Sequence, residues 1–266
     1  MGSNPASGTR SCSVSWLPVV GSHFRVLRQG SPPPEPNCTP VRIILIHGFV
    51  CDARFWGDLP RDLCTDGHEV VTPDLPYHGG STEDVAPSLE GMAAWLVEKH
   101  LQSPVVLVGH SLGGMIALQI VHDHPDLVAG LALVDSFPSL ELNAARLPGL
   151  FAEGRYEDTH VWIMQVRDGL LADMTQATHD TIWPTIASFD ARPWLPGITC
   201  PVLGLYGGRG RYSRAQAAEL QADLLLDQVG GPVEVAVVEN ASHFVQLEEP
   251  QETFAILRDW LARHFQ

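Results

Sequence analysis

The sequence is poor in basic residues. Its 266 residues include 16 Lys and Arg against 31 Asp and Glu, which gives a formal net charge of −15. A chain this acidic repels nucleic-acid phosphates and anionic lipid unless it carries a local basic patch. The densest basic pair is Arg209 and Arg211, and no patch surrounds it. We therefore expect neither a nucleic-acid partner nor a membrane partner.

Cysteine is also scarce, and the spacings of metal ligands are missing. Five Cys lie far apart with no CxxC pair, so neither a zinc site nor a disulfide framework is predicted. The odd number of thiols favours a reducing compartment. No apolar run approaches the roughly 20 residues that span a bilayer, and the N-terminus lacks a signal-peptide pattern. These observations predict a soluble, cytoplasmic protein.

What the sequence does contain is an alternation of apolar runs and helical patterns. The runs are typical of strands buried on both faces, and they cover residues 41–48, 69–73, 104–110, 130–135, 201–207 and 233–240. Helical periodicity covers residues 88–100, 112–122, 213–227 and 250–265. This order predicts an α/β fold with a mostly parallel central sheet flanked by helices.

One long segment interrupts the alternation. Residues 136–200 contain no convincing strand, and helical patterns cover 140–150, 160–171 and 173–186. Loops of this length are uncommon inside a compact domain, so we predict a small helical cap inserted after the strand over 130–135. The expected division is residues 1–136 and 196–266 for the two parts of the core and 137–195 for the cap. Residues 1–12, rich in Gly and Ser, are expected to form a disordered tail.

The strongest chemical signal is the pentapeptide GHSLG at residues 109–113. It is a G-x-S-x-G between a predicted strand and a predicted helix, the pattern of a nucleophile elbow. Glycines on both sides permit a sharp turn that holds the Ser111 hydroxyl at a helix N-terminus, where negative charge is favoured. Serine also needs donors for the oxyanion, and the backbone N–H groups of Phe49 and Leu112 are placed to supply them. Ser111 is the predicted nucleophile.

On these residues the chain resembles the α/β-hydrolases of the single-chain, cap-bearing esterase, lyase and lactonase type. The motifs that carry the resemblance are the His47-Gly48 turn, DLPYHGGS at 74–81, GHSLGG at 109–114 and ENASHFVQLEEP at 239–250. They follow the family's order from about residue 42 to the C-terminus. HGFVCDARFW and DLPYHGGS also resemble the menaquinone-pathway lyase branch, although Tyr77 departs from the family's usual Gly.

The resemblance implies His243 as the base, because the base comes last in the chain. The family's usual acid follows the strand over 201–207, but Gly210 stands at that position. Asp135 ends the strand over 130–135, where family members such as dehalogenases and cofactor-free quinolone dioxygenases carry their acid. Neighbouring parallel strands end in one crevice, so Asp135 can reach His243 there. The alternative is a structural role for Asp135 at the entry to the cap.

Other side chains are assigned more simply. His47 and His78 are expected to be structural, His68 to be exposed, and His110 to point away from the pocket. The candidates for an apolar substrate pocket are Trp56, Trp162, Met164 and Trp183, although core packing explains these residues equally well. No nucleotide-binding motif follows a strand, so we expect no cofactor and no metal, only a small-molecule substrate.

Three functions follow from these residues. The leading hypothesis is a serine hydrolase that cleaves a carboxylic ester or lactone of a small apolar substrate through an acyl-enzyme. The second is a cofactor-independent lyase or dioxygenase that uses His243 and Asp135 as its base. The third is a catalytically inactive ligand-binding protein, which the presence of both Ser111 and His243 disfavours.

Overall fold

The computed structural model describes residues 39–144, 157–209 and 211–266. Its centre is a six-stranded parallel sheet in the order β2-β1-β3-β4-β5-β6. The strands are β1 (Arg42–Ile46), β2 (Glu69–Val71), β3 (Val105–His110), β4 (Val128–Val134), β5 (Val202–Gly207) and β6 (Val233–Val238). Each of the six predicted apolar runs forms one of these strands. The expected tail over residues 1–12 lies outside the described residues.

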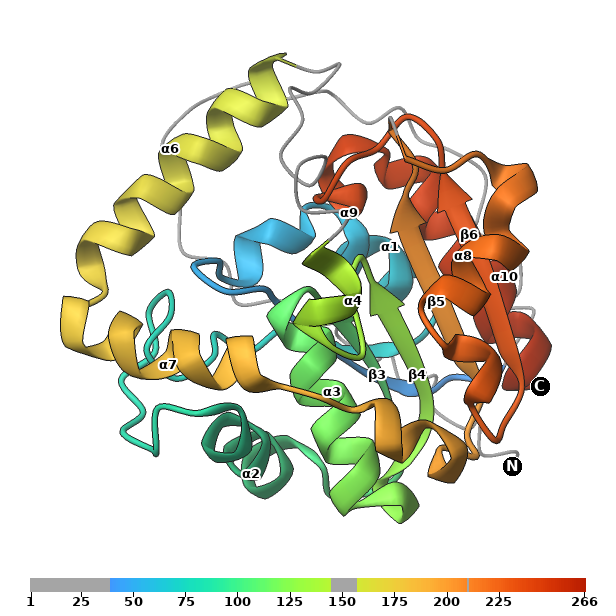
Figure 1. The fold of residues 1–266 in the computed structure, drawn as a ribbon, viewed down its shortest axis with the longest axis horizontal. Coiled ribbons are helices and arrows are strands. Elements are labelled where there is room, and N and C mark those ends of the chain that lie inside the picture. The colour runs from blue at the N-terminus through green and yellow to red at the C-terminus, as the bar shows by residue number, and fades with distance from the viewer. Residues whose placement is uncertain (1–38, 145–156, 210) are drawn as a thin grey trace, which may run out of the picture.

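The apolar runs form strands because the sheet is covered on both faces (Figure 1). Along β1, Ile43 and Leu45 belong to one core cluster, and Ile44 and Ile46 belong to the other. The helices α2 (Leu89–His100), α3 (Leu112–Asp123) and α8 (Ala217–Asp223) pack in the cluster of Ile44. On the opposite face, α1 (Leu59–Thr65) and α10 (Pro250–His264) pack in the cluster of Ile43. Because all six strands are parallel, their carboxyl ends lie at one edge of the sheet, where polar side chains can gather.

The prediction of one continuous helix over residues 213–227 is wrong. The chain instead forms a 3-10 turn (Arg214–Gln216), then α8, then a second 3-10 turn (Leu226–Gln228). Leu225 breaks the helix because it adopts left-handed backbone geometry with φ 58°. This turn lets both Leu224 and Leu226 become fully buried.

A helical insertion separates β4 from β5. It contains α4 (Leu140–Ala144), α6 (Glu157–Asp173), α7 (Gln176–Ser188) and a 3-10 helix (Arg192–Gly197). Figure 1 shows α6 and α7 set to one side of the sheet. Ser139 and Asp190 form an isolated antiparallel bridge, so the chain leaves and re-enters the core at one place. The cap boundaries at 137 and 195 stay a prediction, and residues 145–150 of the expected first cap helix lie outside the described residues.

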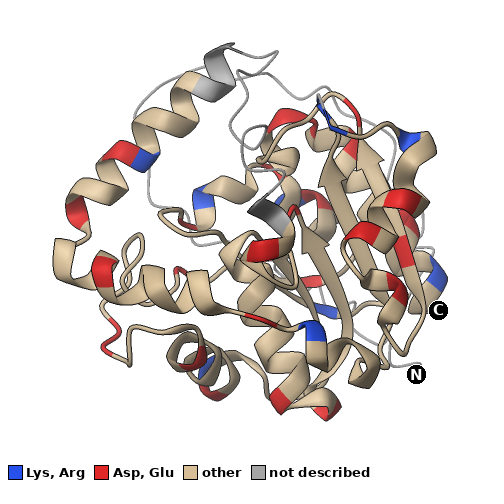
Figure 2. Cartoon of the chain, viewed as in Figure 1, with Lys and Arg blue, Asp and Glu red and all other residues tan. Residues whose placement is uncertain are grey.

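Acidic side chains are spread over the molecule (Figure 2). They occur on α2, α6 and α8, and the few Lys and Arg residues lie between them. Among the described helices, none is both long enough and apolar enough to cross a bilayer.

Candidate active site

Ser111 joins β3 to α3 in a strained backbone conformation, with φ 52° and ψ −118°. A non-glycine residue adopts positive φ only where its surroundings enforce it. Close packing supplies that enforcement, since a Cβ on Gly113 would lie 2.0 Å from the Ile46 carbonyl oxygen. Hydrogen bonds fix the turn from the other side: the Ser111 N–H donates to the Val134 carbonyl at 3.1 Å. The G-x-S-x-G pattern is therefore a packing requirement of this turn.

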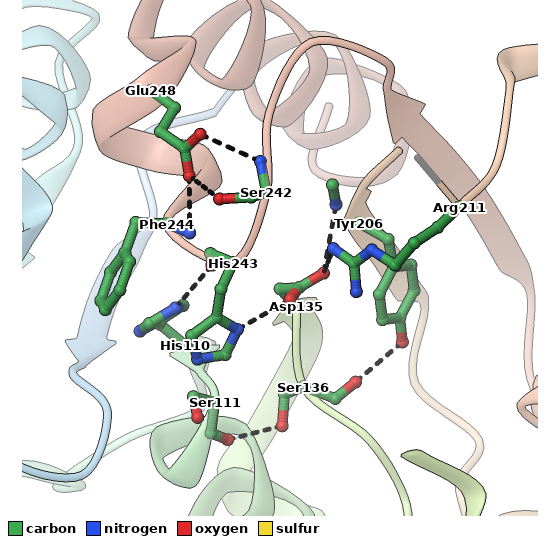
Figure 3. Close-up of polar contacts among 11 residues, drawn as sticks. His110, Ser111, Asp135, Ser136, Tyr206, Arg211, Ser242, His243, Phe244 and Glu248 are labelled. Carbon is green, nitrogen blue, oxygen red and sulfur yellow. Dashed lines mark hydrogen bonds and ion pairs between the residues drawn. The ribbon is translucent and has the colours of Figure 1, made fainter. Parts of the chain in front are cut away.

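Asp135 and His243 meet at the carboxyl ends of the strands. The His243 Nδ1 atom lies 2.8 Å from Asp135 Oδ2, across 108 positions of sequence. A carboxylate only accepts hydrogen bonds, so Nδ1 carries the proton and Nε2 is left as the basic nitrogen. Figure 3 shows the His243 ring between Asp135 and Ser111. The structure thus brings the three expected residues to one place.

Asp135 is fully buried, and both of its carboxylate oxygens have partners. Its Oδ1 atom accepts from the Gly207 N–H at 3.1 Å and lies 3.4 Å from an Arg211 nitrogen. The residue itself has positive φ, 41°, directly after β4. At this second strained backbone position, the Asp135 carboxylate contacts both His243 and the Gly207 N–H at the end of β5.

Sequence reasoning missed the residue that holds the His243 loop. Glu248 lies in the short helix α9 (Val245–Glu248) and is 7% exposed. Its carboxylate accepts from the backbone N–H groups of Ser242 at 3.1 Å and Phe244 at 3.2 Å, the two neighbours of His243 (Figure 3). Arg209 pairs with the same carboxylate at 3.1 Å. The available signal was a pair of acidic residues, Glu248 and Glu249, five and six positions after the histidine.

The two residues expected to form the oxyanion hole lie next to the elbow. A Cβ on Gly48 would meet the Ser111 Cβ at 3.2 Å, so the turn that contains Phe49 packs directly on Ser111. Leu112 is the first residue of α3, and N–H groups in a first helical turn have no acceptor within the helix. Their role as oxyanion donors stays a prediction.

Two buried imidazoles support this turn. His47 Nε2 accepts from the Leu75 N–H at 2.9 Å, and its Nδ1 lies 2.9 Å from the Gly48 carbonyl. His78 Nδ1 lies 2.9 Å from the Pro76 carbonyl. Burial lowers the pKa of His47 to about 4 and the pKa of His78 to about 3. Both rings are therefore neutral at pH 7.

Two assignments of side chains need correction. The expectation that His68 is exposed is wrong, since it is 4% exposed and its Nδ1 accepts from the Val41 N–H at 3.3 Å. Trp56 is fully buried in the core cluster of α1 and α10, so we remove it from the pocket candidates. A side chain enclosed by the core on that face of the sheet has no surface left for a ligand.

The other three pocket candidates, Trp162, Met164 and Trp183, lie on the helical insertion and remain partly exposed. Trp183 of α7 lies 6.0 Å from the Phe49 ring, and Trp162 of α6 lies 5.5 Å from the Phe55 ring, measured between centroids. Trp183 is 46% exposed, and Trp162 and Met164 are 37% exposed. In the described part of the chain, no group of three or more His, Cys, Asp or Glu side chains is arranged to hold a metal ion.

Comparisons with known proteins agree with this geometry. The family model described as "Alpha/beta hydrolase family" matches residues 43–256. Lipase LipV of Mycobacterium tuberculosis is 27% identical over 249 residues, which cover 84% of this chain and 94% of the relative. A pimeloyl-acyl-carrier-protein methyl ester esterase of Neisseria meningitidis is 28% identical over 251 residues, covering 83% and 92%. The solved enol-lactonase of Burkholderia xenovorans has a TM-score of 0.65 at 20% identity and covers 84% and 92%, which shows a shared fold.

Proposed function

The chain belongs to the alpha/beta hydrolase family, as its resemblance indicated, and from this premise we propose a serine hydrolase that cleaves a carboxylic ester or lactone of a small apolar substrate. The observation that carries the proposal is the His243–Asp135 hydrogen bond of 2.8 Å beside the strained turn of Ser111. Relatives named lipase and methyl ester esterase support a carboxylic ester hydrolase.

The reaction begins with attack of the Ser111 Oγ atom on the substrate carbonyl carbon. His243 Nε2 takes the serine proton, and Asp135 stabilises the imidazolium and fixes its orientation. The N–H groups of Phe49 and Leu112 donate to the oxyanion. His243 then gives the proton to the leaving oxygen. Water attacks the acyl-enzyme carbonyl while His243 accepts a proton from it, and that proton passes to Ser111 Oγ as the carboxylic acid leaves.

The electrostatics of the neighbouring rings favour His243 as the single base. His110 lies 4.7 Å from His243 between ring centroids, yet burial and the nearby His243 ring lower the pKa of His110 well below its usual value. His47 is likewise held neutral by burial. His243, by contrast, pairs with the Asp135 carboxylate, an opposite charge that stabilises an imidazolium.

The contacts of the insertion support an apolar substrate and a cap over the site. Trp183 packs on Phe49, beside the elbow, and Ile163 of α6 packs in a cluster with Phe55 and Phe244, the residue after His243. The large apolar side chains that stay most exposed among the described residues belong to these two helices. Exposed apolar groups above a polar site are typical of a wall that receives an apolar ligand.

The position of the proposed acid, Asp135, directly after β4 supports a second candidate function. A His–Asp pair at this position also suits a base that removes a proton from a substrate hydroxyl in a cofactor-independent lyase or dioxygenase. In that reaction Ser111 forms no covalent intermediate. The two functions therefore differ in whether Ser111 becomes acylated.

The test is exposure to a fluorophosphonate, followed by intact mass and peptide mapping. We expect one adduct on Ser111, its loss in Ser111→Ala and its retention in Ser103→Ala, an exposed serine that serves as control. Hydrolysis of 4-nitrophenyl esters of increasing chain length then defines the apolar preference. A folded protein that forms no adduct contradicts the acyl-enzyme and favours the lyase or dioxygenase.

A further inference from the structure

The turn after β5 carries two arginines whose side chains reach two buried acids. Arg209 pairs with Glu248 at 3.1 Å, and Arg211 pairs with Asp135 at 3.4 Å. The Arg211 side chain is only 8% exposed, so this contact lies inside the protein. Relatives usually place their catalytic acid in this turn, and here the turn supplies a cation to an acid on the neighbouring strand.

We propose that Arg211 is a positioning residue for the His243–Asp135 pair and that it keeps His243 available as a base at lower pH. The proposal deepens the proposed function and rests on it, because it assumes that His243 is the base. Two separate consequences follow from the position of Arg211, one for geometry and one for charge.

The geometric consequence arises because the two oxygens of the Asp135 carboxylate contact different partners. Asp135 Oδ2 faces His243, and Oδ1 faces the Gly207 N–H and the Arg211 guanidinium (Figure 3). Contacts on both oxygens fix the rotation of the carboxylate. A fixed carboxylate in turn fixes the His243 ring, since the Nδ1 hydrogen bond follows Oδ2.

The charge consequence comes from burial. Asp135 has no exposed surface, and a buried carboxylate needs an opposite charge. While His243 is neutral, Arg211 balances Asp135 and the three groups together carry no net charge. Protonation of His243 raises that total to +1, so Arg211 disfavours the imidazolium. The base therefore stays unprotonated to a lower pH than a His–Asp pair alone would allow.

Other ionisable groups also surround the pair. His110 faces His243 from β3 and is held neutral by burial. Glu248 of α9 and Arg209 face the loop of His243 and pair with each other. Arg167 of α6 is a further cation near the pair, and its charge acts on His110. Arg211 is the cation that the structure places on Asp135 itself.

The experiment compares Arg211→Gln and Arg211→Lys with the control Arg214→Gln. Arg214 lies in the same connection but pairs with Glu252 at the surface. Two readouts are followed against pH: the rate of fluorophosphonate labelling of Ser111 and the imidazole NMR signals of His243. We expect Arg211→Gln to raise the midpoint of both by about one pH unit. Arg211→Lys and Arg214→Gln should leave the midpoint near that of the wild type.

A folded Arg211→Gln protein with the wild-type midpoint overturns the proposal. If Arg211→Gln does not fold, the double variant Arg211→Gln with Asp135→Asn removes both buried charges and is compared with Asp135→Asn alone. The charge argument requires a higher His243 midpoint in the double variant than in Asp135→Asn alone, and equal midpoints refute it. A wild type that is not labelled at Ser111 counts against the proposed function, whereas the NMR titration still tests Arg211.

Discussion

The His110 Nε2 atom lies 2.9 Å from the backbone carbonyl oxygen of His243. A carbonyl oxygen only accepts, so Nε2 carries a hydrogen and donates it across 133 positions of sequence. The residue directly before Ser111 therefore holds the backbone of the residue proposed as base. Glu248 holds the N–H groups on both sides of that carbonyl, so the segment 242–244 is fixed at three consecutive points.

We expect His110→Phe to lower kcat by about 10²-fold with little change in KM, because a small displacement of the base is costly. His110→Gln keeps an N–H donor and should recover part of the loss. Steady-state kinetics on a 4-nitrophenyl ester measures both, and thermal unfolding checks that each variant is folded. Equal kcat values in the two variants would show that the hydrogen bond to His243 is not what matters.

Asp135→Asn tests the proposed acid. The amide cannot hold the Nδ1–H tautomer of His243 or stabilise its imidazolium, so kcat should fall by about 10⁴-fold. Asp223→Asn is the matched control, since Asp223 is an exposed residue that accepts from the Tyr212 hydroxyl at 2.8 Å. A fall of less than about tenfold in Asp135→Asn removes this residue from the mechanism.

The elbow glycine and a free helical glycine should respond oppositely to alanine. A Cβ on Gly113 would collide with the Ile46 carbonyl, whereas a Cβ on Gly169 of α6 meets nothing within 4 Å. We expect Gly113→Ala to lower the free energy of unfolding by about 3 kcal/mol. Gly169→Ala should raise it by about 0.5–1 kcal/mol, because alanine favours the helix. Urea denaturation measures both, and a Gly113→Ala protein as stable as the wild type contradicts the packing argument.

The buried histidines make stability depend on pH. Burial lowers the pKa of His47 to about 4, and the unfolded chain binds its proton near pH 6.5. The neutral ring therefore contributes stability that is fully present above pH 6.5 and is lost as pH falls toward 4. Between pH 7.5 and pH 5 the free energy of unfolding should fall by about 2 kcal/mol from His47 alone.

The comparison uses urea denaturation at both pH values for the wild type, His47→Gln and His124→Gln, an exposed control. His47→Gln should show a smaller loss between the two pH values than the wild type. His124→Gln should match the wild type, and an unchanged loss in His47→Gln would assign the pH dependence to other groups, such as His78.

Local pattern is sufficient where a residue's role depends on its neighbours in the chain. Apolar runs predicted all six strands, because the inner strands β1, β3, β4 and β5 are covered on both faces and even the edge strands β2 and β6 are mostly apolar. The G-x-S-x-G pattern identified the turn for the same reason, since its glycines are fixed by contacts of the turn itself. These two features predicted an α/β fold with a nucleophile elbow, and the resemblance of four motifs added the alpha/beta hydrolase family.

Local pattern fails where the role depends on a distant backbone. Glu248, His110 and Arg211 act through contacts that appear only once the strands are assembled. Trp56 and Trp183 look alike in sequence, yet one is enclosed by the core and the other is nearly half exposed. The sequence around each tryptophan does not reveal which one is buried, because burial depends on where its helix or turn lies relative to the sheet.

The bridge between Ser139 and Asp190 also bears on how proteins of this kind diversify. The insertion leaves and rejoins the core through these two paired residues, and it also packs on the core through Ile182 and Ile186 of α7 and Ile163 of α6. A change of length between Ser139 and Asp190 therefore enters the chain away from the strand ends that precede Ser111 and Asp135.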